Sequence, residues 1–204
     1  METIAVAQDN FTGLVLAGGE ARRMGGKDKG LIRLAGQPMV QYVLESLSGQ
    51  VGHVIVSANR HRQDYARFGY PVIADDSQGF CGPLAGMASG LKAAQTPFLV
   101  TVPCDSPFVP DDLVQRLYAG LLQADAEISV AHDGDRMHPV FALMKTTLRD
   151  SIVAFLENGD RKIDKWFMQH KLAITNFSDK PETFMNINTP DDLALIEARL
   201  VEKI

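Results

Sequence analysis

The stretch FTGLVLAGGEARRMGGKDKG, residues 11–30, contributes most to the predicted fold. Its first seven residues are mainly apolar and are followed by two glycines, as expected for a short buried parallel strand. The rest is a glycine-rich loop that carries Arg22, Arg23, Lys27 and Lys29. Glycines let backbone N–H groups approach an anion closely, and the four cations add positive charge. A phosphate-binding loop is therefore favoured over a surface loop that is basic by chance, although the pattern is neither a Walker loop nor a dinucleotide-binding loop.

Strand and helix patterns alternate along the chain after this loop. Such alternation implies right-handed βαβ crossovers and a sheet that is covered on both faces. We therefore expect a three-layer, Rossmann-like α/β domain with a mostly parallel central sheet over residues 11–204, preceded by a flexible tail over residues 1–10. Further strands are expected at residues 53–57, 71–74, 97–102, 127–131, 139–144 and 172–177, and helices at 38–47, 62–68, 82–94, 110–122, 146–157, 164–170 and 189–202.

Composition narrows the class of protein. The chain has 204 residues, enough for one such domain, and a formal net charge of −5, which argues against a nucleic-acid-binding surface. The first ten residues contain no apolar signal region, and no run approaches the roughly 18 apolar residues of a membrane helix. Two cysteines, Cys81 and Cys104, are normal for a reducing compartment, and their role is open. We expect a cytoplasmic protein, monomeric or weakly oligomeric, without nucleic-acid or membrane partners.

Two carboxylates follow predicted strands. Asp105 comes directly after the apolar run of residues 97–102 and its Pro-Cys, and Asp75 ends the strand of residues 71–74. Ligands bind at the carboxyl ends of strands in sheets of this kind, and one carboxylate with phosphate oxygens and waters is a usual Mg²⁺ site. Asp105 is the candidate metal ligand, with a helix cap or loop acid as the alternative. Asp75 would bind a nucleotide hydroxyl or share the metal.

The motif FMNINTP, residues 184–190, offers two amide side chains. Alternation of an extended segment places Asn186 and Asn188 on the same side. Amides can hold a metal-bound water or a pyrophosphate oxygen. An equally good interpretation is a turn in which Asn188 or Thr189 caps the last helix.

Three further motifs carry weaker signals. Gly82 lies in a loop that enters a helix N-terminus, a geometry suited to an anion or a base, although a tight turn explains it nearly as well. The basic spots at residues 136–139 and 159–162 could meet a phosphorylated acceptor, but isolated surface charge is the favoured interpretation. The five histidines have no zinc-site spacing, and no nucleophile motif is present.

Six motifs, in order along the chain, resemble those of the molybdenum cofactor guanylyltransferase family, MobA, within the nucleoside-triphosphate transferase superfamily. They span residues 11 to about 200. The six are LAGGEARRMGGKDKG (16–30), VSANRH (56–61), VIAD (72–75), GPLAGM (82–87), PCDSP (103–107) and NINTP (186–190).

The resemblance implies a set of site residues. Lys29 and Asp105 would be catalytic, with Asp105 as the ligand of Mg²⁺, the implied cofactor. Where the family often has Asn at the end of the second strand, this chain has Ser57, so Asn59 is included as a substitute contact. GTP would be bound by Leu16, Ala17, Gly18, Gly19, Lys29, Asn59, Asp75, Gly82 and Asp105. Molybdopterin would be bound by Arg22, Arg23, Arg161, Asn186 and Asn188.

The implied reaction is transfer of GMP from GTP to the terminal phosphate of molybdopterin, with release of pyrophosphate. Transient contacts with proteins of molybdenum insertion and molybdoenzyme maturation are also expected. A cytidylyltransferase or sugar-phosphate nucleotidyltransferase of the same fold is the enzymatic alternative. A non-catalytic cofactor carrier is the alternative of another class, but it would not need the metal carboxylate Asp105.

Overall fold

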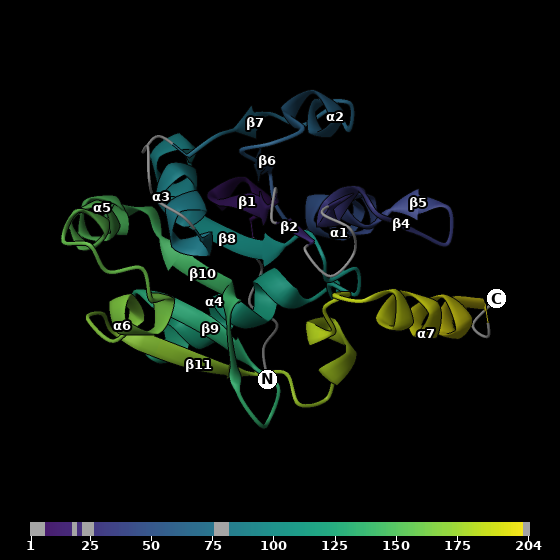
Figure 1. The fold of residues 1–204 in the computed structure, drawn as a ribbon. Coiled ribbons are helices and arrows are strands. Elements are labelled where there is room, and N and C mark those ends of the chain that lie inside the picture. Colours follow the sequence, from purple (N-terminus) through teal and green to yellow (C-terminus); the bar gives the residue numbers. More distant parts are fainter. Residues whose placement is uncertain (1–6, 18–19, 22–26, 76–81, 202–204) are drawn as a thin grey trace.

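In the described part of the chain, the central sheet has seven strands in the order β11-β9-β10-β8-β1-β6-β7 (Figure 1). The computed structural model describes residues 7–17, 20–21, 27–75 and 82–201. Every pairing within the sheet is parallel except those of β10, which runs antiparallel to both β8 and β9. The predicted mostly parallel sheet is thus confirmed. The strands are β1 (Phe11–Leu16), β6 (His53–Ser57), β7 (Val72–Ile73), β8 (Phe98–Pro103), β9 (Ile128–His132), β10 (Met137–Lys145) and β11 (Leu172–Asn176).

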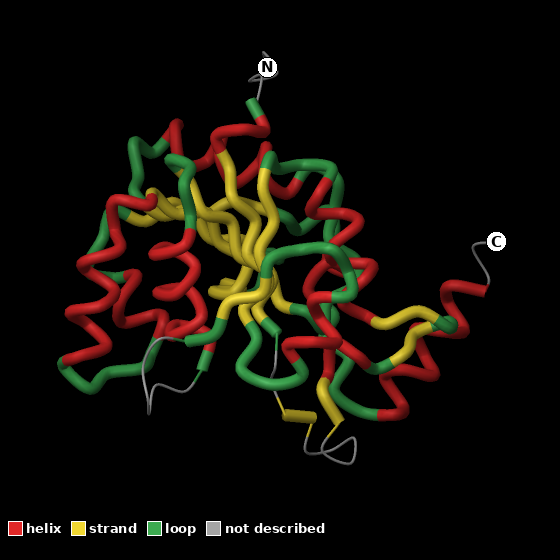
Figure 2. The backbone as a smooth tube through the Cα atoms, turned by 90° about the horizontal axis from the view of Figure 1, so that it is seen from above, coloured by secondary structure: helices red, strands yellow, loops and turns green. Residues whose placement is uncertain are grey.

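Helices cover both faces of the sheet, which gives the predicted three layers (Figure 2). On one face, α1 (Met39–Ser48) and α4 (Leu113–Gln123) pack against side chains such as Phe11 and Val15 of β1. On the other face, α3 (Pro83–Ala93), α5 (Arg149–Glu157) and α6 (Ile163–Phe167) contribute to a second apolar cluster that contains Leu14 of the same strand. Successive residues of β1 point to opposite layers, so its continuous apolar run is explained by burial on both faces.

The observed elements follow the predicted ones closely, with some shorter and one longer. The helix α2 (Arg62–Ala66) ends two residues before the expected position. The strand β10 begins earlier than expected and contains a register shift between His138 and Ala142. Two small hairpins were not predicted, β2 (Glu20–Ala21) with β3 (Lys27–Asp28) and β4 (Arg33–Leu34) with β5 (Gln37–Pro38). Such two-residue pairs carry too little sequence pattern to be recognised.

A third apolar cluster attaches the last helix, α7 (Pro190–Val201), to the segment that follows the glycine-rich loop. Ile196 of α7 and the preceding Ile187 pack against Leu34 and Met39. The backbone N–H of Ala35 also donates to a carboxylate oxygen of Glu197 at 2.9 Å. The cluster therefore holds residues 185–196 beside residues 32–39, although they are far apart in the sequence.

The start of the described chain is attached to the domain. Residues Gln8–Asn10 form a single 3-10 turn, and Gly52 donates its N–H to the Gln8 carbonyl at 2.7 Å. The Gln8 side chain donates to the Gly49 carbonyl at 2.6 Å. The predicted tail over residues 1–10 thus includes residues that pack against the loop after α1. No helix in the described part of the chain is long and apolar enough to span a membrane.

Candidate active site

The carboxyl ends of four neighbouring strands meet at one edge of the sheet. Leu16 is in register with both Ser57 of β6 and Pro103 of β8. The pairing continues for one residue beyond the strands, because Ala17 donates to the Ser57 carbonyl at 2.8 Å and Cys104 donates to the Leu16 carbonyl at 3.0 Å. This edge is where sheets of this kind bind ligands. Leu16 and Ala17 lie at its centre, between the segments that carry the other candidate residues.

Three predicted site residues converge at this edge. The ammonium nitrogen Nζ of Lys29 lies 3.0 Å from Oδ2 of Asp105 and 2.5 Å from Oδ1 of Asn188. The side chains of Lys29 and Asp105 are 22% and 10% exposed, so the pair is partly shielded from water but open on one side. We call Lys29, Asp105 and Asn188 the Lys29 cluster. It brings a cation, a carboxylate and an amide from three distant parts of the sequence into contact.

Lys29 is held in place by its neighbour Asp28, whose role was not predicted. The Asp28 side chain is only 3% exposed. It accepts hydrogen bonds from the hydroxyl of Tyr65 and from the N–H of Gly30, and it lies 3.2 Å from Nδ1 of His61. A Cβ on Gly30 would lie 2.6 Å from the Tyr65 hydroxyl oxygen, so only glycine fits here. These contacts fix the 3-10 turn Lys29–Leu31 and so the point from which Lys29 extends.

The segment 186–188 lies along the residues that follow β8. Ile187 donates its N–H to the Asp105 carbonyl at 3.2 Å, and the Ser106 hydroxyl donates to Oδ1 of Asn186 at 2.5 Å. Asn186 thus contacts Ser106, and Asn188 contacts Lys29. Capping of the last helix falls to Thr189, whose hydroxyl accepts from the N–H of Asp192 at 3.1 Å. The two interpretations of the motif therefore apply to different residues in it.

Asp75 belongs to a separate polar group on the β6–β7 side. Its carboxylate accepts from the Asn59 amide nitrogen at 2.8 Å and lies 3.5 Å from the Ser57 hydroxyl oxygen. Asn59 in turn accepts from the Asp75 N–H at 2.9 Å. Ser57 and Asn59 thus both contact Asp75, and the structure brings together the two residues between which the sequence left a choice.

Asp105 has the chemistry of a magnesium ligand. Among the described residues, no group of three or more His, Cys, Asp or Glu side chains could hold a metal ion. A single carboxylate suits Mg²⁺, which keeps several waters and binds through substrate phosphates. The neighbouring Cys104 is buried, and burial raises the pKa of its thiol well above the usual value. The thiol thus stays protonated and is suited neither to metal binding nor to nucleophilic attack.

The remaining predicted residues lie outside this convergence or outside the described part. Gly82 is exposed and has φ of 104°, a conformation that favours glycine, directly before α3. Arg161 donates to the carbonyl groups of Leu156 and Asp160 at 2.6 and 2.8 Å, which holds it at the end of α5. Its role towards an acceptor stays a prediction. Gly18, Gly19, Arg22, Arg23 and Cys81 lie outside the described residues.

The arrangement as a whole is suited to a polyphosphate ligand. The Lys29 ammonium lies at the edge where β1 and β8 end, beside Asp105. A carboxylate for a metal stands beside the cation, and a hydroxyl, an amide and a second carboxylate stand on the β6–β7 side. Cation, metal and amides together can neutralise the charge that develops when a phosphate bond breaks.

Comparisons with known proteins agree with this chemistry. A family model described as the MobA-like NTP transferase domain matches residues 13–173. A molybdenum cofactor guanylyltransferase from Shewanella loihica is 49% identical over 178 residues, which are 87% of this chain and 91% of that protein. Another, from Shewanella sp. strain MR-4, is 46% identical over 92% of this chain and 95% of its own length. The crystal structure of molybdopterin-guanine dinucleotide biosynthesis protein A from Archaeoglobus fulgidus has a TM-score of 0.78 and 25% identity, with coverage of 95% of this chain and 100% of that one.

Proposed function

The chain belongs to the MobA-like NTP transferase family, and we propose that it transfers GMP from GTP to the terminal phosphate of molybdopterin. The names of the Shewanella and Archaeoglobus relatives support this substrate pair. The observation that carries the proposal is the contact of Lys29 with Asp105 and Asn188 at the carboxyl edge of the sheet. It unites a cation for phosphate with a carboxylate for a metal, and a carrier protein has no need of that combination.

In the proposed reaction an oxygen of the molybdopterin phosphate attacks the α-phosphorus of GTP. The bond from that phosphorus to the bridging oxygen of the β-phosphate breaks, and pyrophosphate leaves with the electron pair. No covalent enzyme intermediate is needed, so the protein contributes position and charge. Lys29 would meet the negative charge that grows on the departing pyrophosphate, and Asn188 would orient the ammonium.

Asp105 would hold Mg²⁺, the proposed cofactor, because its carboxylate pairs with Lys29 and lies just after the end of β8. When bound, the ion neutralises charge on the phosphate oxygens. Leu16, Ala17 and the Asp75 group would bind the nucleotide, with Asn59 and Ser57 fixing the Asp75 carboxylate. Asn59 donates to Oδ2 of Asp75 and accepts from its backbone N–H, and Oδ1 of the carboxylate lies towards Ser57.

Incubation of the protein with molybdopterin, Mg²⁺ and one nucleotide at a time tests the proposal. We expect pyrophosphate release with GTP and little with CTP, ATP or UTP, and no release when EDTA removes the metal. GTP should also raise the melting temperature more than the other nucleotides at equal concentration. Faster turnover and a larger thermal shift with CTP would identify a cytidylyltransferase, and turnover with a sugar phosphate in place of molybdopterin would identify the other enzymatic alternative.

A further inference from the structure

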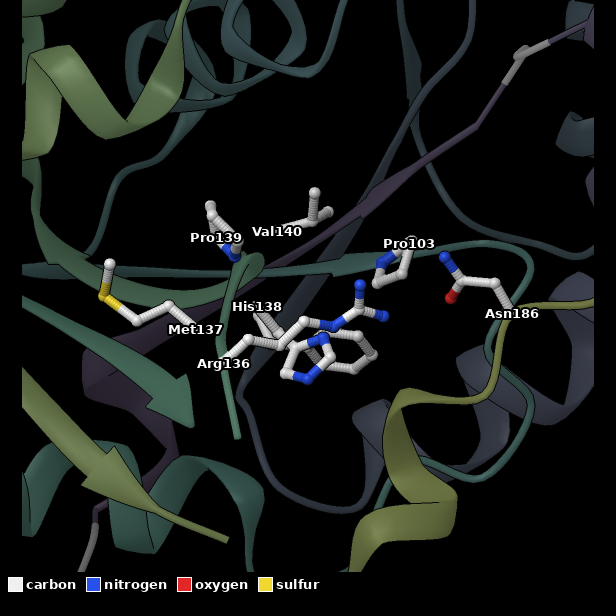
Figure 3. Close-up of a pocket in the computed structure, with 8 residues that line it drawn as sticks. Pro103, Arg136, Met137, His138, Pro139, Val140 and Asn186 are labelled. Atoms are coloured by element: carbon white, nitrogen blue, oxygen red, sulfur yellow. The ribbon is translucent and has the colours of Figure 1, made fainter. Parts of the chain in front are cut away.

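We propose that a pocket beside the Lys29 cluster, on the β10 side of the sheet, binds the phosphate-bearing end of the acceptor. This inference rests on the proposed function. The pocket has a volume of about 220 Å³ (Figure 3). Two of the residues that line it, Pro103 and Asn186, belong to the segments that carry the Lys29 cluster. The others are Arg136, Met137, His138, Pro139, Val140 and Phe141 of the β9–β10 turn and β10.

The pocket owes its shape to a bulge in β10. Pairing with β9 shifts register between His138 and Ala142. Pro139 lies inside this irregular stretch and has no N–H to donate to a neighbouring strand. The Thr101 hydroxyl of β8 donates to the Val140 carbonyl at 2.7 Å, which satisfies a group left by the bulge. Bulges commonly redirect side chains beside active sites, and here the bulged residues form the wall of the pocket.

Arg136 supplies a cation to the pocket. Among the described residues its guanidinium has no hydrogen-bond or ion-pair partner, whereas its backbone N–H donates to Asp133 at 2.8 Å. In Figure 3 the guanidinium extends past the His138 ring and points towards Pro103 and Asn186. An arginine that is fixed at its backbone and free at its head is suited to binding a phosphate through two parallel hydrogen bonds.

The His138 ring lies next to this cation and is itself held in place by two contacts. Its ring stacks on Phe184 with centroids 4.0 Å apart, and its Nε2 lies 2.7 Å from Oδ2 of Asp133. Hydrogen bonds from the N–H of Arg136 and from His138 hold the pKa of Asp133 well below its usual range, so this acid is ionised and occupied. None of the described residues that line the pocket carries a carboxylate.

Asn186 adds a second donor. Its Oδ1 accepts from Ser106, and among the described residues its amide nitrogen has no partner. Pro103, Pro139, Val140 and Phe141 supply apolar surface next to these donors. A pocket with two anion donors, no acid and apolar walls fits a phosphate ester attached to a ring system better than it fits a neutral sugar.

The position along the sheet agrees with an acceptor site. The Asp75 group follows β6 and β7, whereas the pocket adjoins β8 and β10. Lys29 follows β1, and Asp105 follows β8, so the Lys29 cluster lies between the two. A nucleotide on the Asp75 side and a phosphate in the pocket would therefore approach the Lys29 cluster from opposite sides, as transfer between them requires.

Equilibrium dialysis of molybdopterin, without GTP, tests the inference directly. Arg136→Ala should weaken molybdopterin binding roughly ten-fold or more, because a charged hydrogen-bonding group is lost. Arg136→Lys should restore part of the affinity, since it keeps the charge without the planar fork. Arg149→Ala is the matched control, because Arg149 is an exposed arginine at the start of α5 and outside the pocket. It should bind molybdopterin as the unmodified protein does.

Steady-state kinetics separate this inference from the proposed function. In Arg136→Ala the KM for molybdopterin should rise about ten-fold while the KM for GTP stays within about two-fold. Unchanged molybdopterin binding, or a rise confined to the KM for GTP, would overturn the pocket as an acceptor site and leave the proposed function intact. Absence of pyrophosphate release in the unmodified protein, combined with weakened molybdopterin binding in Arg136→Ala, would refute the transfer reaction and support the pocket.

Discussion

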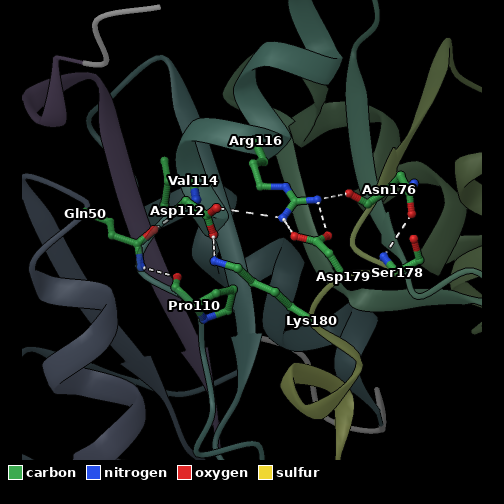
Figure 4. A network of polar contacts seen from close by, with 9 residues as sticks. All are labelled: Gln50, Pro110, Asp112, Val114, Arg116, Asn176, Ser178, Asp179 and Lys180. Atoms are coloured by element: carbon green, nitrogen blue, oxygen red, sulfur yellow. Dashed lines mark hydrogen bonds and ion pairs between the residues drawn. The ribbon is translucent and has the colours of Figure 1, made fainter. Parts of the chain in front are cut away.

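Two ionic groups join the segment after β11 to the rest of the domain. They differ in whether their charged groups remain available to a ligand. In the Lys29 cluster one ammonium contacts one carboxylate and one neutral amide at an open edge of the sheet. The second group, which we call the Arg116 network, consists of Arg116, Asp112, Asp179 and Lys180 (Figure 4).

The Arg116 network is saturated by the protein. Arg116 donates through both terminal nitrogens to the Asp179 carboxylate, at 2.8 and 2.9 Å, and also to the Asn176 carbonyl. Its guanidinium carbon lies 4.1 Å from the centroid of the Phe177 ring. Lys180 donates to Asp112 at 2.8 Å. Two cations meet two carboxylates, so no charge is left for a ligand.

The difference shows why ion pairs of similar length can serve different ends. The Lys180–Asp112 and Lys29–Asp105 contacts are 2.8 and 3.0 Å long. Lys180 and Asp112 are surrounded by partners that complete a balanced network, and their contribution is to stability. Lys29 and Asp105 lie at the open end of the sheet. There a phosphate could take the place of Asp105 beside Lys29, and a metal ion could take the place of Lys29 beside Asp105. Four substitutions test this contrast.

Asp105→Asn should have the largest effect. The amide keeps the size of the side chain but removes the charge that would hold Mg²⁺, so we expect turnover to fall roughly 10³-fold with the fold intact. Pyrophosphate release and thermal unfolding measure the two quantities. A variant with nearly normal turnover would show that Asp105, like the Arg116 network, has only a structural role.

Lys29→Ala should lower kcat roughly 10²-fold, because its charge acts most strongly as the pyrophosphate departs. Lys180→Ala is the matched control, since it also removes a lysine paired with an aspartate. The control should leave kcat within about two-fold. Similar small rises in KM for both variants, reproduced by added salt, would mean that Lys29 contributes only diffuse attraction.

Arg116→Ala should affect stability instead of turnover. It removes the paired hydrogen bonds to Asp179 and the contact with Phe177, so the free energy of unfolding should fall by about 1–2 kcal/mol. Urea unfolding followed by circular dichroism gives this value, and pyrophosphate release should be unchanged. A large loss of turnover without a loss of stability would contradict the division between the two groups.

Asp179→Asn should have the smallest effect, and one that depends on pH. The Arg116 guanidinium holds the pKa of Asp179 below its usual value. A lowered pKa in the folded state stabilises the protein above the unfolded pKa of about 3.9, and the gain is lost as the pH falls through the folded pKa. The difference in melting temperature between the unmodified protein and this variant should thus be present at pH 6 and shrink below pH 4. A difference that is constant with pH would exclude the ion pair as its source.

The sequence predicts much of the sheet and part of the site. The strands β1, β6 and β8 are short apolar runs buried on both faces, and such runs are visible without tertiary information. Asp105 could be proposed because it follows a predicted strand, and the carboxyl ends of parallel strands meet at one edge. Lys29 is one of four cations in the loop after the first strand, and the resemblance to the family singles it out.

Other features depend on contacts that no local pattern records. Tyr65 reaches Asp28 across 37 positions, and Lys29 reaches Asn188 across 159. The sequence favours surface charge at Arg136, because the pocket that it shares with Asn186 forms only when β10 pairs in the sheet. The short hairpins and the packing of α7 were missed for the same reason.

The site cannot be complete until α7 has been synthesised, because the packing of α7 holds residues 185–188 in place. All seven strands of the sheet lie before residue 177, so they can pair as soon as that much of the chain has left the ribosome. Asn186 and Asn188 emerge later, and Ile196 must follow before the third cluster can hold them in place. A chain synthesised only as far as residue 177 would contain Lys29 and Asp105 but not Asn188, the amide that contacts Lys29. The site is therefore complete only once the last helix has been made and packed against residues 32–39.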